Sequence, residues 1–244
     1  MWCEKHKIEY EPKQINMPGG ITITTMCPLC AQERDMEIER EEKARVASAY
    51  EIDMREMNIE PEFWDATIDT YQAEIPGQIK AVQTVKRLIV GEIQQIVMTG
   101  SNGTGKTHLA IAAVKALGGK IYTMYEITTR IRQSYSARSD ETELEIVDEL
   151  ARLPMLAIDE VGRTKGSDAE LNWLSYIIDK RHTRDLPTII ISNKHVRKYC
   201  PLGGCPECLE NYLSGDVMSR LTEGGVLLQF NWEDWRKRGI NHDS

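Results

Sequence analysis

The sequence predicts an α/β fold, in which helices cover a parallel β-sheet and a small separate module precedes them. From about residue 76 onward, short apolar runs alternate with amphipathic stretches of helical period, the pattern of a parallel sheet with helices on its faces. A glycine-rich segment with the P-loop pattern lies between one such run and one such stretch. The first 30 residues instead hold prolines, glycines and short-spaced cysteine pairs, which predict a loop-rich knuckle.

The composition fits a globular protein with one main domain and a smaller appendage. The chain has 244 residues, 41% of them apolar and 28% charged, and a formal net charge of −8. An acidic chain does not attract phosphate backbones or anionic membranes as a whole, so contact with nucleic acid must come from a local patch. No signal-peptide pattern and no run of about 18 apolar residues is present. We therefore expect a cytoplasmic protein with no membrane partner.

Three segments are expected along the chain: a zinc-binding knuckle over 1–31, a helical segment over 32–75, and the main domain over 76–244. In the helical segment Val46, Tyr50, Met54 and Met57 fall on one face, at three- and four-residue spacings. This narrow stripe fits either a solvated linker helix or a helix that binds a partner protein. In the main domain the expected strands are 95–99, 120–124, 155–158, 188–192 and 226–230, and the expected helices are 79–90, 106–117, 127–135, 141–152, 169–183 and 217–221.

A phosphate-binding loop is predicted where one expected strand leads into one expected helix. Its residues match G-x-x-x-x-G-K-[ST], and they are Gly100, Ser101, Asn102, Gly103, Thr104, Gly105, Lys106 and Thr107. Glycines allow a tight loop whose backbone N–H groups face phosphate, and the helix N-terminus favours negative charge. Lys106 is expected to reach the β- and γ-phosphates of ATP, and Thr107 to offer its hydroxyl to Mg²⁺.

Polar residues end the two apolar runs that follow, at the strand edge where open α/β sheets bind ligands. Asp159 is expected to hold Mg²⁺ through water, and Glu160 to orient and polarise the water that attacks ATP. Asn193 is expected to contact the γ-phosphate, the alternative being a plain turn residue at a strand end. Together these residues predict Mg²⁺-dependent hydrolysis of ATP to ADP and phosphate. A switch that holds ATP with negligible turnover is a further possibility, against which the intact Asp159-Glu160 pair argues.

The order and spacing of these motifs resemble the AAA+ superfamily, and within it the DnaC/DnaI-type replicative helicase loaders. The resemblance covers roughly residues 80–236, and its details are His108-Leu109-Ala110, Ile158-Asp159-Glu160-Val161-Gly162, Arg220-Leu221 and Phe230-Asn231-Trp232. It implies an ATPase that self-associates with ATP and loads a replicative DNA helicase onto single-stranded DNA. IstB-like transposition ATPases share much of the same core, so an ATPase that regulates a transposase on target DNA is the alternative.

The resemblance also implies roles for individual residues. Arg220 resembles the arginine finger that completes the site of a neighbouring subunit, although a surface arginine at a helix end is the alternative. Arg236 resembles the family's second sensor arginine, which contacts phosphate within the same chain, and His108 is grouped with the nucleotide-binding residues. For single-stranded DNA the candidates are Arg130, Arg132, Tyr135 and Arg138, where cations and an aromatic ring alternate; a solvated helix surface explains the same pattern.

The six cysteines fall into two clusters, which predicts metal binding rather than disulfides in a reducing compartment. The first cluster supplies three thiolates and one imidazole for a structural zinc ion, from Cys3, His6, Cys27 and Cys30. The module resembles the zinc-containing region by which some loaders bind the helicase. The second cluster, Cys200, Cys205 and Cys208, needs a fourth ligand, for which His195 is the nearest candidate. A second zinc site and an exposed loop of reduced thiols both remain open there.

Overall fold

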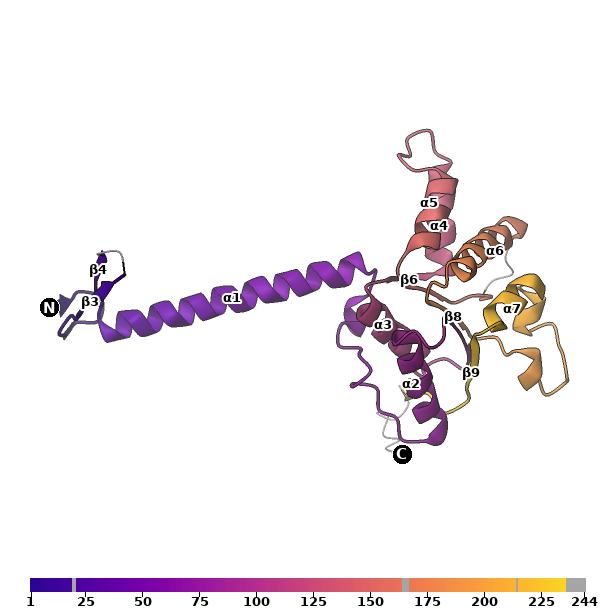
Figure 1. The fold of residues 1–244 in the computed structure, drawn as a ribbon, viewed down its shortest axis with the longest axis horizontal. Coiled ribbons are helices and arrows are strands. Elements are labelled where there is room, and N and C mark those ends of the chain that lie inside the picture. Colours follow the sequence, from indigo (N-terminus) through magenta and orange to yellow (C-terminus); the bar gives the residue numbers. More distant parts are fainter. Residues whose placement is uncertain (19–20, 164–166, 214, 236–244) are drawn as a thin grey trace, which may run out of the picture. The chain divides into compact units, whose positions relative to one another are not determined.

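The computed structural model describes residues 1–18, 21–163, 167–213 and 215–235. The chain divides into two compact units, Met1–Asp53 and Met54–Ser244, whose elements are labelled in Figure 1. None of the helices in the described ranges combines the length and the apolar character needed to cross a membrane.

The N-terminal unit holds two small hairpins and most of a long helix. Strand β1 (Trp2–Cys3) pairs with β2 (Ile8–Glu9), and β3 (Gln14–Met17) pairs with β4 (Ile21–Thr24), both antiparallel. These strands were not predicted, because two to four residues are too few to show a period. Helix α1 (Pro28–Glu56) begins four residues before the expected start. A proline in the first helical turn is well tolerated, since that turn has N–H groups with no partner in the helix.

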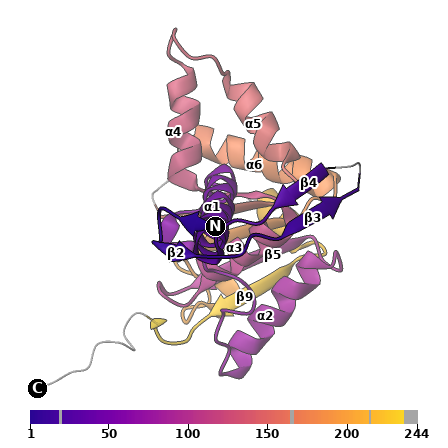
Figure 2. The same ribbon diagram turned by 90° about the vertical axis from the view of Figure 1, so that its left-hand side faces the viewer.

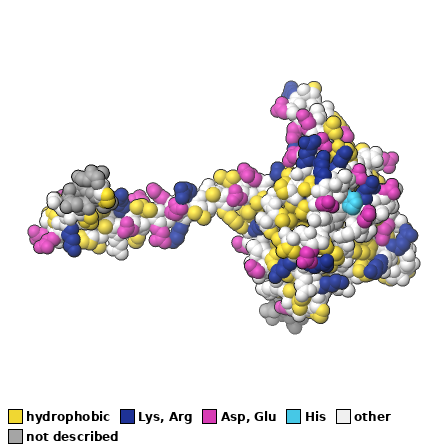
Figure 3. All heavy atoms as spheres, in the orientation of Figure 1, with side chains coloured by type: hydrophobic (Ala, Val, Ile, Leu, Met, Phe, Trp, Pro, Cys, Tyr) yellow, Lys and Arg dark blue, Asp and Glu magenta, His cyan; other side chains and the backbone are white. Residues whose placement is uncertain are grey.

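Most of α1 is exposed, and its surface mixes charged with apolar side chains (Figure 3). Lys43 pairs with Glu39 at 2.6 Å and Arg45 with Glu42 at 2.7 Å, which are spacings that support an isolated helix. Large apolar side chains are nevertheless exposed along the helix, at Met36, Ile38, Val46, Tyr50 and Ile52. Of the predicted stripe, Met54 is buried and Met57 packs against the core of the second unit.

A parallel five-stranded sheet forms the centre of the second unit. Its strand order is β6-β7-β8-β5-β9, and all four pairings are parallel. The strands are β5 (Gln95–Gly100), β6 (Lys120–Thr123), β7 (Leu156–Asp159), β8 (Thr188–Ser192) and β9 (Val226–Phe230). All five predicted strands are confirmed. Because the strands are parallel, the carboxyl ends of β5, β7 and β8 lie at the same edge of the sheet.

Helices cover both faces of this sheet, which confirms the predicted α/β class. Alternate residues of β5 enter different cores: Met98 packs with α2 (Pro76–Ile89) and α3 (Lys106–Leu117), whereas Val97 packs on the opposite face. The opposite face is covered by α4 (Met124–Ser134), α5 (Glu143–Arg152), α6 (Asp168–Thr183) and α7 (Gly215–Thr222). Figure 2 shows α2 on one side of the sheet and α4 to α6 on the other.

Capping boxes set the starts of two helices. Thr123 accepts a hydrogen bond from the backbone of Glu126 and returns one to the Glu126 carboxylate, so α4 begins three residues before the predicted start. The same exchange between Thr142 and Glu145 starts α5. Because Thr123 caps a helix, strand β6 ends there rather than at the expected residue 124.

The segment that precedes α2 belongs to the second unit. Phe63, Trp64, Ile68 and Tyr71 pack against its core, and the Trp64 indole donates a 3.0 Å hydrogen bond to the carbonyl of Ile59. The helical segment expected over 32–75 therefore spans both units. Its last part runs along the sheet edge where β5, β7 and β8 end.

Candidate nucleotide-binding site

The loop between β5 and α3 has a backbone that its glycines make possible. Gly100, Gly103 and Gly105 have φ values of 131°, 70° and 87°, in the region that side chains disfavour. A Cβ atom on Gly100 would lie 2.0 Å from the carbonyl oxygen of Phe230, and one on Gly105 would lie 2.5 Å from the Tyr71 ring. Both glycines are therefore required by close neighbours as well as by backbone conformation.

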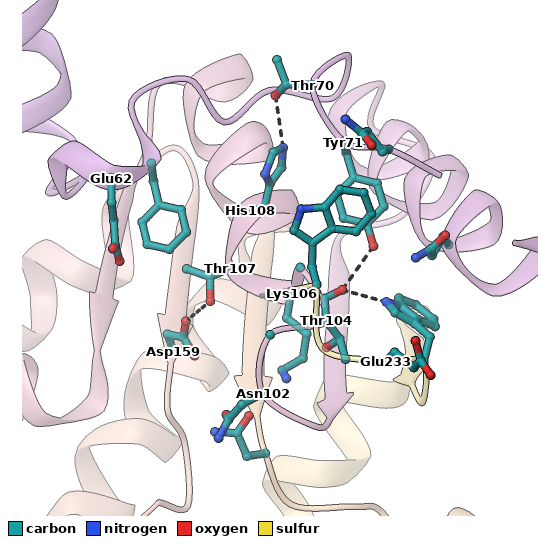
Figure 4. A pocket seen from close by; sticks show the side chains of 18 of the residues that line it. Glu62, Thr70, Tyr71, Asn102, Thr104, Lys106, Thr107, His108, Asp159 and Glu233 are labelled. Atoms are coloured by element: carbon teal, nitrogen blue, oxygen red, sulfur yellow. Dashed lines mark hydrogen bonds between the residues drawn. The ribbon is translucent and has the colours of Figure 1, made fainter. Parts of the chain in front are cut away.

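Lys106 lies inside this loop rather than in solvent. Its ammonium donates hydrogen bonds to the carbonyls of Gly100 at 2.9 Å and Ser101 at 2.6 Å, and the residue is only 5% exposed. Helix α3 begins at Lys106, so its N-terminal N–H groups face the same space as the ammonium (Figure 4). The loop thus combines a buried cation with a helix N-terminus, an arrangement that can hold phosphate.

Thr107 and Asp159 meet across the loop. The Thr107 hydroxyl donates a 2.7 Å hydrogen bond to Asp159 Oδ2 (Figure 4). The backbone N–H of Glu160 donates a 2.6 Å bond to Asp159 Oδ1. Burial raises the pKa of Asp159, and these two hydrogen bonds offset part of that shift. A divalent cation would favour the ionised carboxylate, and hydroxyl and carboxylate oxygens are the donors that Mg²⁺ prefers. The residues present therefore fit Mg²⁺.

Glu160 follows directly, in an uncommon backbone conformation. Its φ is 58°, the left-handed region that costs a non-glycine residue on the order of 1 kcal/mol. Its carboxylate forms an ion pair with the exposed guanidinium of Arg163 and lines the same pocket as Asp159. Asn193, just beyond β8, lines this pocket too. The structure therefore brings together the three polar residues predicted at the ends of two strands.

The pocket has a volume of about 520 Å³, within the range of small-molecule sites. Besides the loop and the strand ends, two further segments line it: residues from Glu62 to Gln78, and Trp232, Glu233 and Trp235. Both segments form hydrogen bonds to the same loop carbonyl, that of Thr104. It accepts hydrogen bonds from Tyr71 at 3.3 Å and from the Trp232 indole at 2.9 Å (Figure 4).

The Tyr71 contact was missed by the sequence analysis, which named Trp232 only as part of a family motif. Burial raises the pKa of Tyr71 to about 12, so its hydroxyl stays protonated and donates. His108 faces the same segment, with Nε2 2.8 Å from the Thr67 carbonyl and its ring 5.4 Å from that of Tyr71. An aromatic wall of this kind can hold the base of a nucleotide. No spacing in the sequence signals it.

One predicted residue, Arg220, lies away from this pocket. Arg220, on α7, pairs with Asp179 of α6 at 2.6 Å, and it is not among the described residues that line the pocket. Arg236 falls outside the described residues. A direct role of Arg220 in the pocket of its own chain is therefore not supported, which leaves the expected role in a neighbouring subunit as a prediction.

Three of the four candidate DNA-contacting residues, on α4 or just after it, already have acidic partners. Arg130 forms ion pairs with Glu141 and Glu149, and Arg132 pairs with Glu170 at 3.0 Å. The Tyr135 hydroxyl donates to the carboxylate of Glu143. These carboxylates cancel the local positive charge that a phosphate backbone would need, so the solvated-surface explanation fits this helix better.

The first cysteine cluster is assembled in the N-terminal unit. The ligand atoms of Cys3, His6, Cys27 and Cys30 lie within 4.8 Å of one another. The Cys3 and Cys30 sulfurs are 3.6 Å apart, and His6 Nδ1 lies 3.6, 3.8 and 3.3 Å from the three sulfurs. Tetrahedral zinc, with bonds of about 2.3 Å to sulfur and about 2.0 Å to nitrogen, sets these separations at about 3.8 and about 3.6 Å. The four residues therefore fit one zinc ion.

A carboxylate supports this cluster from outside. Glu33 Oε1 lies 3.0 Å from His6 Nε2, the ring nitrogen that faces away from the three sulfurs. Carboxylates in this position fix the ring orientation of metal-binding histidines. The four candidate zinc ligands therefore come with a carboxylate, that of Glu33 on α1, which holds the His6 ring in position.

The fold and the loop together define a P-loop nucleotide-binding protein with an AAA+ type of core. The family model of IstB-like ATP binding proteins matches residues 31–239, and the chain belongs to this family. It is 28% identical over 189 residues to the replicative helicase loader DnaC of Escherichia coli (strain K12), covering 74% of this chain and 73% of DnaC. It is also 25% identical over 180 residues to the ATP-binding protein of insertion sequence IS5376 from Geobacillus stearothermophilus, covering 70% and 68% of the two chains.

Solved structures agree with this assignment. The crystal structure of the DnaC helicase loader matches with a TM-score of 0.59 and 25% identity, over 70% of this chain and 99% of that one. DnaI matches with a TM-score of 0.56 and 19% identity, over 72% and 93%, and so shares the fold. The predicted resemblance to AAA+ helicase loaders, with IstB-like ATPases as relatives, is confirmed.

Proposed function

We propose that this protein is an ATP-dependent loader of a replicative DNA helicase, acting on single-stranded DNA. The observation that carries the proposal is a complete loop-and-carboxylate site, in which Thr107 meets Asp159 and Glu160 follows, within a chain similar to DnaC over about three quarters of its length. A protein that only held nucleotide would not need the carboxylate of Glu160 beside this pair.

The proposed hydrolysis follows from the positions of the side chains. The loop N–H groups and Lys106 hold the phosphates of ATP, while Thr107 and Asp159 hold Mg²⁺, which neutralises charge on those phosphates. Glu160 orients the attacking water once its carboxylate leaves Arg163. Asn193, on the neighbouring strand end, reports whether the γ-phosphate is present.

Self-association completes the proposed site. Arg220 is 40% exposed in its side chain and lies on α7, outside its own chain's pocket. A guanidinium supplied by a neighbouring subunit would neutralise charge on the transferred phosphoryl group, so hydrolysis would require assembly. The pairing with Asp179 holds Arg220 on the surface until a neighbour binds.

The N-terminal unit is the proposed helicase-binding part. Its zinc cluster fixes the hairpin to the start of α1, and α1 exposes large apolar residues such as Ile38 and Val46. Exposed apolar side chains spaced along a helix suit a partner that buries them. We therefore favour the partner-binding explanation of this helix over that of a solvated linker.

The direct test is to mix the full chain with a hexameric replicative helicase, with and without ATP, and to measure complexes by native mass spectrometry. The substitution pair Ile38→Glu and Val46→Glu is expected to abolish the complex while ATP binding is retained. Glu41→Ala, on the same exposed helix, is the matched control. Absence of a complex with several such helicases, alongside retained ATPase activity, would reject the loader proposal.

A second candidate function is regulation of a transposase on target DNA. It is favoured by the match to the IstB-like family and to the insertion-sequence protein. Filaments formed on duplex DNA with ATP, together with no affinity for a replicative helicase, would select this function instead.

A further inference from the structure

The second cysteine cluster comes together in the loop that joins β8 to α7. The ligand atoms of His195, Cys200, Cys205 and Cys208 all lie within 4.8 Å of one another. His195 Nε2 is 3.2 Å from the sulfur of Cys205, which is 3.9 Å from the sulfur of Cys208. The fourth ligand that the cysteine spacing left undecided is thus supplied by His195.

These separations fit one metal ion. Tetrahedral zinc with one nitrogen and three sulfur ligands needs about 3.6 Å between nitrogen and sulfur and about 3.8 Å between sulfurs. The local backbone also suits metal binding. The N–H of Cys205 donates to the sulfur of Cys208 at 3.3 Å, and Gly203 turns the chain with a φ of 67°. Three sulfurs and one imidazole favour zinc over the hard cations Mg²⁺ and Ca²⁺.

We propose that His195, Cys200, Cys205 and Cys208 bind a second structural zinc ion, which fixes the β8–α7 loop beside the nucleotide pocket. The chain folds back within this loop, so that residues near its end contact His195 near its beginning. His195 forms a parallel bridge with Cys208, and the N–H of Leu209 donates a 2.9 Å hydrogen bond to the His195 carbonyl. One ion at this crossing holds both ends of the loop.

The start of the loop is tied to the strand ends that form the pocket. One residue, Lys194, separates Asn193 from His195, and its N–H donates a 3.1 Å bond to the hydroxyl of Ser192. That hydroxyl in turn donates a 2.6 Å bond to the carbonyl of Val161, next to Glu160. A fixed His195 therefore restrains Asn193 and the turn that carries Glu160.

Packing on the far side of the loop strengthens this restraint. Gly162, in the same turn, has a φ of 80° and close neighbours: a Cβ atom there would lie 3.0 Å from Lys194 Cδ and 3.4 Å from the Tyr212 ring. Cys208 and Leu209 are fully buried, and Leu213 is nearly so. The proposed ion thus lies between two packed segments of the loop. One of them continues from Asn193, and the other leads to α7, the helix of Arg220.

Metal analysis of the purified full chain tests the site itself. We expect two zinc ions per chain in the wild type, one in Cys205→Ser, one in Cys27→Ser, and none in the double variant. The conservative variant Cys205→His keeps a ligand and should keep two. One zinc in the wild type, lost completely in Cys27→Ser, would overturn the proposal. This measurement does not depend on ATPase or loader activity, so it stands if the proposed function fails.

Kinetics test the positioning role, which rests on the proposed ATPase activity. Cys205→Ser should lower kcat by roughly tenfold to a hundredfold, as displacement of a catalytic group does, while the Kd for a fluorescent ATP analogue stays within about threefold. When it is combined with Asn193→Ala, the further loss of kcat should be smaller than in the wild type, because the part of the effect that acts through the Asn193 side chain is already lost. Unchanged kcat after loss of the second zinc, or full additivity with Asn193→Ala, would contradict a role through Asn193.

Discussion

The hydroxyl of Thr107 donates a hydrogen bond to the carboxylate of Asp159, with 2.7 Å between the oxygens. This bond joins the first residues of α3 to the end of β7 at the place where Mg²⁺ fits. Thr107→Val removes the hydroxyl without changing the size of the side chain, whereas Thr107→Ser keeps it.

We expect Thr107→Val to weaken binding of Mg²⁺-ATP by about tenfold, a change of about 1.4 kcal/mol, because one oxygen ligand is lost. Binding of ATP in EDTA should be unchanged, since the loop and Lys106 remain. Titration of a fluorescent ATP analogue with and without Mg²⁺ measures both. Equal loss in the two conditions would show that Thr107 supports the loop rather than the metal.

Glu160→Gln should keep ATP binding and lower turnover by at least about a hundredfold, because the amide cannot polarise the attacking water. Phosphate release gives the rate, and the same fluorescent analogue gives the affinity. Arg163→Gln is the matched control: it frees the Glu160 carboxylate and should leave turnover intact. Wild-type rates in Glu160→Gln would move the role of base to another residue.

Arg220→Ala should abolish ATPase activity, because each pocket then lacks the arginine that the neighbouring subunit supplies. Mixing Arg220→Ala with Glu160→Gln should therefore restore activity, since some interfaces then pair an intact pocket with an intact arginine. A chain carrying both changes should restore nothing when mixed with Arg220→Ala. If Arg220→Ala lowers the rate at dilutions where the wild type is monomeric, the role between subunits is wrong.

Arg181 is a buried cation that holds the second unit together. It is fully buried on α6 and donates to the carbonyls of Leu150, Leu153 and Pro187 and to the Thr188 hydroxyl, at 2.7 to 3.0 Å. All four partners are neutral, and burial lowers the pKa of Arg181 to about 9.

We expect Arg181→Leu to lower the free energy of unfolding by about 3 kcal/mol, because several buried carbonyls lose their hydrogen-bond donor. Denaturant unfolding measures the change, and Arg184→Leu, whose guanidinium reaches one carbonyl at 3.2 Å, is the control. A loss below about 1 kcal/mol would mean that water replaces the guanidinium.

Loss of the first zinc should affect the two units differently. Cys27→Ser removes one ligand from the N-terminal cluster, so the Met1–Asp53 unit should become sensitive to protease. Affinity for ATP should not change, because the nucleotide pocket lies wholly in the second unit. Limited proteolysis and the fluorescent analogue measure the two effects. Wild-type protease resistance in Cys27→Ser would reject a structural role for that metal.

Local patterns predicted the sheet and the loop because both depend on short spacings. The five strands are apolar runs, and Gly100 to Thr107 is a contiguous motif. Contacts between segments that are distant in the sequence were not predictable. Tyr71 and Trp232, near the two sequence ends of the second unit, both donate hydrogen bonds to the Thr104 carbonyl. Arg181 was also missed, because an arginine on an amphipathic helix is more often exposed than buried.

The first cluster of cysteines was predicted because its two pairs complete a ligand set, and the structure adds Glu33, which no spacing indicates. The second cluster was incomplete as a sequence pattern. His195 lies five residues from the nearest cysteine, and only the return of the loop at Cys208 brings it into the set.

Strand β9 has a consequence for how the protein is made. It pairs with β5 directly below the phosphate loop, from Ile96 with Val226 to Gly100 with Phe230, and Trp232 bonds to Thr104 from 128 residues away. During synthesis, the ribosome has therefore made the loop long before the strand that supports it emerges. A nascent chain stalled before residue 226 lacks one edge of the sheet and the indole of the pocket wall. ATP would then stabilise the newly made protein only after almost all of the second unit has left the ribosome, because a ligand stabilises only the folded state that binds it.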